Sequence, residues 1–482
     1  MRALYLNGPY RGLAYSRASR SPAVTKSGTL YYPLWLASAA GLARQEGLEV
    51  SLVDAVARRW ERGELIRFLQ DGPPPQLVVL DTTTPSIDED LLTAGTLKEA
   101  FPATTIALAG THATACAQEV LGYEGVDVVL RGEYDRSAIE LARALEAGKD
   151  LGEVTGLSFR RDGAVEHTQE GALIEDLDSL PFLSRPCRDF LRLEDYFFAA
   201  ARYPMVMTIT SRGCPHRCGW CLYPQVMHRG KYRTRSARNV ADEFAFISQE
   251  MPRVREVGIE DDLFTGDRRR LRTICEMLIE QRNRVGFWCD TRVDLDYETM
   301  RLMKAAGCRL LIAGFESASQ AVLDEIGKGT QAGQAGAFMA NARKARLLVH
   351  GCFVVGNPGE TRETMRETLE MAKRLNPDTA QFFPMIVYPG TRLYGWAKEK
   401  RYLRAKSYGD YLTAEGGHNS VVDLPGLPGG EVLAFCDHAR REFYLRKGYV
   451  LRKMGQSVLS WSEAQRNFKA FRRFARHLVR AS

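Results

Sequence analysis

The sequence contains no uninterrupted apolar stretch of ~18 residues, which is about the length that a membrane-spanning helix needs. Its first six residues lack the pattern of a secretory signal. Ten cysteines among 482 residues are too few, and too unevenly placed, for a secreted disulfide framework. A composition of 45% hydrophobic and 26% charged residues excludes a disordered or fibrous chain. We therefore expect a soluble, cytoplasmic protein of roughly two or three domains.

Short apolar runs alternate with helical patterns in the first third of the chain, which is typical of a doubly wound α/β sheet. Ligands bind such sheets at the carboxyl ends of the strands, where the polar loops 81–86, 110–112 and 132–133 stand. We assign residues 1–150 to this domain. The predicted strands are 3–7, 49–55, 76–81, 104–110 and 126–131, with helices such as 34–46 and 135–146 between or after them.

A turn-rich segment, 151–203, separates this domain from a second β/α series. It contains a predicted hairpin at 156–167 around Asp162-Gly163, followed by a linker with prolines. The second series provides six βα units without a seventh and eighth, which predicts a partial (β/α)6 barrel over 204–400, open on one side. Its predicted strands are 205–210, 254–260, 285–290, 309–316, 349–356 and 379–387.

Three cysteines, Cys214, Cys218 and Cys221, follow the first predicted barrel strand on one loop. Three thiolates can ligate three irons of a cubane cluster and leave the fourth iron open to a small molecule. A zinc site normally has four ligands, usually as two paired half-sites, and no second cysteine pair stands elsewhere in the sequence. A zinc loop completed by His216 is the alternative to an iron–sulfur cluster.

The spacing Cys-x3-Cys-x2-Cys, with Trp220 before the third cysteine, resembles the hallmark of the radical S-adenosylmethionine (SAM) superfamily. The resemblance extends over most of the predicted barrel. It implies a [4Fe–4S] cluster whose open iron binds SAM. The segments that resemble strand-end motifs of a large subgroup of this superfamily are 260–265, 291–294, 314–317, 356–361 and 388–391.

The same resemblance implies roles for individual residues. Trp220 would lie beside the adenine of SAM, and Arg292 is suited to the SAM carboxylate because its guanidinium is always charged and forked. Glu316 is suited to the amino group or the ribose hydroxyls. The other expected contacts of SAM are Asp262, Ser317 and Gly356.

The first domain, with its segments 32–37 and 132–135, resembles the cobalamin-binding class of radical SAM proteins. The motif Asp-x-His-x-x-Gly, whose histidine ligates cobalt in other corrinoid proteins, is absent from loop 81–86. Cobalamin, as methylcobalamin, is therefore expected to bind without a histidine on its lower face. The expected contacts are Thr82, Thr83, Thr84, Ser86, Gly110, Thr111, His112, Gly132 and Glu133.

Two alternatives concern this domain. It could be a flavodoxin-like module without a ligand, and His112 could be a loop histidine bonded to the backbone rather than a cobalamin contact. The tRNA methylthiotransferases share the barrel but carry a further cluster on three N-terminal cysteines. Only Cys116 and Cys187 precede the triad here, which excludes that group.

The resemblance implies a cobalamin-dependent methyltransferase acting on an unactivated carbon of a natural-product, lipid or protein substrate. Reduction of the cluster, by a flavodoxin- or ferredoxin-type donor, would split SAM into methionine and a 5′-deoxyadenosyl radical. That radical would take hydrogen from the substrate, which then receives a methyl group from methylcobalamin. Segments 220–225 and 443–446 also resemble a radical SAM protein of hopanoid biosynthesis. The alternatives are carbon–carbon coupling or cyclisation, and a cluster-bearing regulatory protein that does not turn SAM over.

The net charge of +7 is concentrated at the C-terminus: from Arg440 onward the sequence has twelve Arg and Lys but only two acidic residues. No nucleic-acid partner is expected. Residues 401–482 are assigned to a basic helical region with predicted helices at 442–451 and 463–479. The second helix has an aromatic stripe that we expect to close the open side of the barrel. Peripheral membrane contact, or a surface for a partner, is the alternative.

Overall fold

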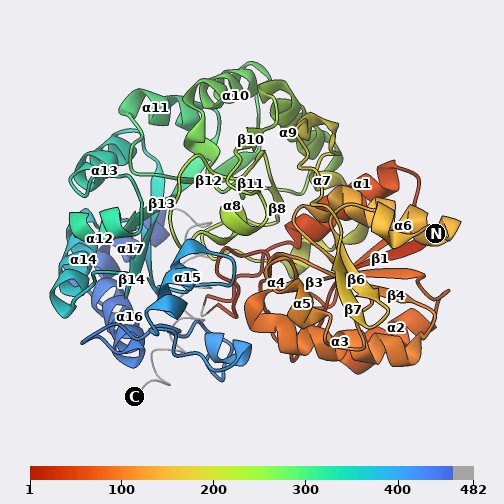
Figure 1. Cartoon of the computed structure of the whole chain (residues 1–482). Helices are drawn as coiled ribbons and strands as arrows, with labels where there is room; N and C mark the ends of the chain where they lie inside the picture. The colour runs from red at the N-terminus through yellow and green to blue at the C-terminus, as the bar shows by residue number, and fades with distance from the viewer. Residues whose placement is uncertain (26, 460–482) are drawn as a thin grey trace.

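The computed structural model describes residues 1–25 and 27–459. Two α/β domains lie side by side, the first in red to yellow and the second in green to blue (Figure 1). The predicted helix at 463–479 lies outside the described residues, so its expected role stays a prediction. Within the described ranges, no helix is both long and apolar enough to cross a bilayer.

The N-terminal domain contains a seven-stranded sheet in the order β2-β1-β3-β4-β5-β6-β7. Strands β1 to β5 run parallel, which confirms the doubly wound prediction, and β6 and β7 form the predicted hairpin and extend the same sheet. The order 2-1-3-4-5 places the topological switch point, where ligands bind, between β1 and β3. The bounds are β1 Arg2–Asn7, β2 Glu49–Asp54, β3 Leu77–Asp81, β4 Thr105–Ala109, β5 Val128–Leu130, β6 Leu157–Arg161 and β7 Ala164–His167.

Helices cover both faces of this sheet (Figure 1). Helices α1 (Leu34–Gln45) and α6 (Tyr134–Ala147) pack against each other on one face, and α2 (Arg62–Gln70) and α3 (Ile87–Ala100) lie on the other. Unbroken apolar strands such as β3 are buried because both faces are covered.

The second domain is a six-stranded sheet in the order β15-β14-β13-β12-β11-β8, parallel throughout. Among the residues that the structure describes, neither β15 nor β8 pairs with a further strand, which confirms the predicted partial barrel. Its helices form an outer ring (Figure 1). The bounds are β8 Met205–Thr208, β11 Glu256–Ile259, β12 Gly286–Thr291, β13 Cys308–Glu316, β14 Leu348–Val355 and β15 Thr379–Pro384, with α7 Ser184–Phe190, α9 Ala237–Glu250, α10 Arg268–Glu280, α11 Tyr297–Ala305, α12 Gln320–Glu325, α13 Gln334–Lys344, α14 Arg362–Leu375 and α15 Arg392–Glu399.

Alternate residues of each barrel strand point inward and outward. On β12, Phe287 packs against Phe244 of α9 and faces outward. Trp288 therefore faces inward, where its ring contacts Phe198 and lies over Gly258 of β11. A Cβ on Gly258 would lie 2.2 Å from this ring, so the glycine makes room for the tryptophan.

The predicted helix at 442–451 is wrong as one element. Helix α16 (Gly429–Tyr444) ends before that segment does, and α17 (Lys447–Leu459) begins after a break. The break has a physical cause: the guanidinium of Arg446 donates to the carbonyl of Lys373 (2.7 Å) and to Asn376, at the end of α14. Helix α16, which we did not predict, packs on edge strand β15.

Candidate active site

The carboxylate of Asp261 fixes the chain just before the loop that carries the three cysteines. Asp261, just after β11, accepts hydrogen bonds from the backbone N–H of Thr210 (2.5 Å) and of Ser211 (3.0 Å) and from both hydroxyls. Gly213 then adopts a φ of 82°, and a Cβ there would lie 1.9 Å from the carbonyl oxygen of Lys231. Only glycine fits this close approach of two backbones, which starts the cysteine loop.

The donor set of the loop suits a cluster of several irons. Cys214, Cys218 and Cys221 are free thiols, and α8 (Leu222–Val226) begins directly after the third. A hydrogen bond with Cys221 lowers the pKa of Cys218, whereas burial raises the pKa of Cys214 to about 11. Within the described residues, no three metal-ligand side chains converge on a point that a single ion could occupy. A cubane cluster would take the three thiolates on three separate irons.

Arg292, Glu316 and a lysine that the sequence analysis missed come together beside the cysteine loop. Lys328 Nζ donates to Glu316 Oε1 (2.6 Å), and Arg292 Nη2 donates to the carbonyl of Lys328. Both Lys328 and Arg292 act electrostatically on Cys218. Among the described residues, the buried Glu316 Oε2 and Arg292 Nε have no hydrogen-bond partner. Such free polar atoms at a strand end suit a zwitterionic ligand like SAM.

The backbone of Glu316 is in the left-handed region, at a φ of 60°. This conformation is uncommon for a residue with a side chain, and it turns the carboxylate toward Lys328. A signal for Lys328 did exist in the sequence: it stands between Gly327 and Gly329, both with positive φ. Glycines on both sides allow a sharp turn that points the lysine into the barrel.

The other predicted SAM contacts lie in two kinds of surroundings. Asp262 Oδ2 accepts from the backbone N–H of Gly213 (3.1 Å), and the indole N–H of Trp220 is buried without a partner among the described residues. Ser317 is instead 3.4 Å from the Thr368 hydroxyl, and Gly356 faces Val432 of α16. Asp262 thus lies beside the cysteine loop and Trp220 within it, whereas Ser317 contacts α14 and Gly356 contacts α16. That these four residues bind SAM stays a prediction.

The predicted cobalamin loop after β3 forms a short 3-10 helix, Thr84–Ser86. Thr83 Oγ1 is hydrogen-bonded to the hydroxyls of Ser86 (2.9 Å) and Tyr15 (2.7 Å). Thr82 beside it is fully buried. The loop is thus ordered by its own side chains, with Tyr15 added from the segment after β1.

The second cobalamin loop follows β4. Gly110 has a φ of 101°, and a Cβ there would lie 2.4 Å from Asp81 Oδ1. His112 Nδ1 is 3.1 Å from Thr84 Oγ1, and burial lowers the pKa of His112 to about 4, so its ring is neutral at pH 7. Among the described residues, the buried His112 Nε2 and Thr111 Oγ1 have no partner. Orphaned polar atoms beside a glycine cradle fit a large polar ligand such as the corrinoid tail.

Glu133 makes contacts between the domains, whereas Gly132 is bonded within its own domain. The backbone N–H of Gly132 donates to Thr114 Oγ1 (3.0 Å). Glu133 is buried against Arg212, Arg233 and His228, with His228 Nδ1 2.7 Å from its Oε1. Burial opposes ionisation, but these partners hold the pKa of Glu133 well below its usual range. The structure therefore gives Glu133 a full set of partners within the protein.

The predicted cobalamin loops and the cysteine loop meet at the domain boundary. Helix α4 (Thr111–Ala115) packs against α8, and the Thr114 hydroxyl lies 3.7 Å from Met227 Sδ. Tyr223 of α8 donates to the carbonyl of Arg17 (3.4 Å). The carboxyl end of the N-terminal sheet thus faces the cysteine-bearing end of the barrel.

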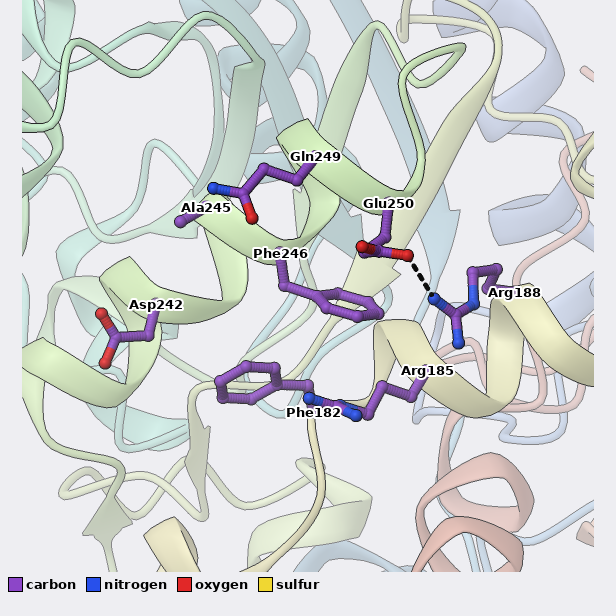
Figure 2. A pocket seen from close by; sticks show the side chains of 8 residues that line it. All are labelled: Phe182, Arg185, Arg188, Asp242, Ala245, Phe246, Gln249 and Glu250. Atoms are coloured by element: carbon purple, nitrogen blue, oxygen red, sulfur yellow. Dashed lines mark hydrogen bonds and ion pairs between the residues drawn. The ribbon is translucent and has the colours of Figure 1, made fainter.

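A hollow on the surface lies elsewhere, between α7 and α9, and none of the predicted site residues lines it. Figure 2 shows the rings of Phe182 and Phe246 with Arg185 beside them; the guanidinium lies 4.8 Å from the centre of the Phe246 ring. Arg188 bonds Glu250 at 3.1 Å. These contacts hold α7 and α9 together around the hollow.

Comparison with known proteins gives two family matches. Residues 208–372 match the radical SAM superfamily, and residues 20–142 match the B12 binding domain. An uncharacterised methyltransferase of Pyrococcus horikoshii is 28% identical over 88% of this chain and 90% of its own. An anaerobic magnesium-protoporphyrin IX monomethyl ester cyclase of Cereibacter sphaeroides is 26% identical, covering 86% and 67%. A hopanoid C-3 methylase of Methylococcus capsulatus is 24% identical, covering 78% and 70%.

The fold is also that of a solved structure, the radical SAM methyltransferase TsrM of Kitasatospora setae with tryptophan and a SAM analogue bound. It aligns with a TM-score of 0.71 and 18% identity over 91% of this chain and 90% of its own. The barrel match carries the cofactors of its family, a [4Fe–4S] cluster and SAM, and the N-terminal match carries cobalamin. The chain therefore contains a B12-binding domain followed by a radical SAM domain.

Proposed function

We propose that this enzyme transfers a methyl group to an unactivated carbon of a natural-product, lipid or protein substrate. When bound, the cluster and SAM supply a hydrogen-abstracting radical, and cobalamin supplies the methyl group. The observation that carries the proposal is the direct packing of α4 on α8, because it supports a site where the predicted cobalamin loops lie next to the cysteine loop. A substrate between the two sites could meet both cofactors without leaving the protein.

The chain's own residues would bind, orient and shield. Cys214, Cys218 and Cys221 would hold the cluster, and Arg292 and Glu316 would clamp the carboxylate and amino groups of SAM. Loops 82–86 and 110–112 would hold cobalamin from the other side. A closed site between two domains excludes water and so protects radicals from side reactions. A low-potential flavodoxin- or ferredoxin-type donor in the cytoplasm would supply electrons.

The second candidate is a radical coupling or cyclisation reaction. It is favoured by the similarity to the cyclase of Cereibacter sphaeroides. The two candidates consume SAM differently: methyl transfer converts one SAM to S-adenosylhomocysteine for each that yields 5′-deoxyadenosine, whereas the other reaction forms no S-adenosylhomocysteine.

The test is a product analysis of the anaerobically reconstituted enzyme with cobalamin, reductant and SAM carrying a deuterated methyl group. We expect 5′-deoxyadenosine, S-adenosylhomocysteine and a deuterated methyl group on cobalamin. Formation of 5′-deoxyadenosine without the other two products would contradict methyl transfer and support coupling or cyclisation.

A further inference from the structure

The segment after β1 crosses from the cobalamin side of the molecule into the barrel. Tyr15 bonds the cobalamin loop through Thr83, and five residues later Arg20 reaches the barrel strands. There Arg20 Nη1 lies 3.1 Å from Asp290 Oδ2 and 3.6 Å from Glu260 Oε2, and its Nη2 donates to the carbonyl of Asp261. Arg20 therefore stands between the two predicted cofactor sites.

Glu260 and Asp290 lie side by side on the inner wall of the barrel. The parallel register of β11 and β12 pairs Gly258 with Trp288 and Ile259 with Cys289, and Glu260 and Asp290 are the next residues of the two chains. Both are an even number of residues from the inward-facing pair, so their side chains share that face. Their side chains are 3% and 15% exposed.

The two carboxylates have fewer partners than their burial requires. Among the described residues, the buried Glu260 Oε1 accepts no hydrogen bond, and Arg20 is the ion-pair partner of Asp290. One guanidinium thus faces two carboxyl groups. Burial, with Asp290 adding, raises the pKa of Glu260 to about 8, as expected for an acid whose negative charge lacks compensation.

The acidic pair is close to the predicted SAM contacts. Cys352 of β14 is within electrostatic range of Glu316 and Lys328 and also of Asp290 and Arg20. The Arg20 guanidinium beside Glu260 and Asp290 shows that these two carboxylates can bind a cationic nitrogen group.

We propose that Glu260 and Asp290, with Arg20 beside them, form a substrate subsite for a cationic nitrogen group, a protonated amine or a guanidinium. This inference rests on the proposed function, because it places the substrate between the two cofactor sites. Glu260 Oε1 is the free acceptor, and a bound cation would stabilise its ionised form.

The test uses two probes of the same shape, methylguanidinium and neutral methylurea, titrated by calorimetry into the reconstituted full-length enzyme. We expect methylguanidinium to bind about tenfold more tightly than methylurea, since a charge-assisted hydrogen bond is worth at least that factor. Glu260→Gln should remove this preference. Asp294→Asn, an equal charge change at an exposed ion pair with Arg268, should keep it.

Arg20→Gln tests the same subsite in a second way. Removal of the competing guanidinium should strengthen methylguanidinium binding several-fold. Equal binding of the two probes, no binding of methylguanidinium, or an unchanged preference in Glu260→Gln would overturn the inference. SAM cleavage by the wild-type enzyme in the same preparation tests the proposed function separately. Cleavage without a cation preference overturns the subsite alone, and a cation preference without cleavage overturns the proposed function.

Discussion

Arg212, two residues ahead of Cys214, forms a two-point ion pair with Asp135 of the other domain. Its Nη1 lies 2.8 Å from Asp135 Oδ2 and its Nη2 lies 2.9 Å from Oδ1, and both side chains are buried. Ser38 bonds both partners. The cysteine loop is thereby fixed to the B12-binding domain at its first residues, so the distance between the two predicted cofactor sites depends on this contact.

Asp135→Ala should therefore destabilise the protein strongly. Removal of one partner from a buried ion pair leaves an uncompensated charge and costs about 3–5 kcal/mol. Denaturant unfolding followed by far-UV circular dichroism measures the change. Asp242→Ala, which breaks an exposed i,i+4 pair with Arg238, is the matched control and should cost less than about 1 kcal/mol. Equal effects of both variants would show that the Arg212–Asp135 pair does not hold the domains together.

The cysteine triad predicts metal content. Anaerobically reconstituted protein should bind about four irons, with a broad thiolate-to-iron absorption, and Cys218→Ala should abolish SAM cleavage. Cys275→Ala is the control, since that thiol is buried in the core outside the motif and should not affect iron content. Stoichiometric zinc without iron uptake, in protein purified without oxygen, would contradict the cluster.

The contacts around Glu316 predict how SAM is oriented. Arg292→Ala and Glu316→Ala should each reduce 5′-deoxyadenosine formation about tenfold or more, because each removes a charge-assisted bond of about 1.5–3 kcal/mol. Arg292→Lys should restore only part of the activity, since an ammonium lacks the forked geometry. Iron content is measured in every variant. Normal SAM cleavage in both alanine variants, at matched iron content, would mean that Arg292 and Glu316 are structural ion-pair residues.

The raised pKa of Glu260 predicts a pH dependence of stability. Between its ordinary value of 4.5 and about 8, the folded protein holds a proton that the unfolded chain has lost, so stability falls as pH rises through this window. The charged groups that face Glu260 are Asp290, Asp261, Asp262 and Arg20, with Tyr31 nearby. Glu260→Gln should reduce the slope by up to about 1.4 kcal/mol per pH unit. Chemical denaturation from about pH 5 to 8 measures the slope, and an unchanged slope in this variant would contradict the buried acid.

The sequence predicted most of the fold because strand patterns are local. All eleven predicted parallel strands are present, since unbroken apolar runs between helical segments admit few other structures. Helix α16 was missed and the segment 442–451 was wrongly joined, because the break depends on a contact of Arg446 with residues about 70 positions earlier. Such contacts leave no periodic signal in the sequence.

Candidate site residues could be predicted where they belong to a sequence motif, and not where they depend on contacts between residues far apart in the sequence. Arg292 and Glu316, predicted as strand-end residues, both contact Lys328 near Cys218, and their binding of SAM stays a prediction. Arg20 and Asp290, by contrast, form an ion pair although they lie 270 positions apart in the sequence and in different domains. The partnership of Glu133 with Arg212 and His228 likewise depends on how the domains dock, which local spacing does not encode.

The most direct test of the account is the magnetic interaction between the two cofactors. Protein loaded with cob(II)alamin and a reduced [4Fe–4S] cluster is examined by continuous-wave and pulsed electron paramagnetic resonance, beside samples that hold either centre alone. Because α4 packs on α8, we predict spectra split or broadened by coupling between the two spins, absent from both single-cofactor samples. A spectrum that is the simple sum of the two, at full occupancy of both cofactors, would contradict the claim that the cobalamin and cluster sites face each other across one reaction space.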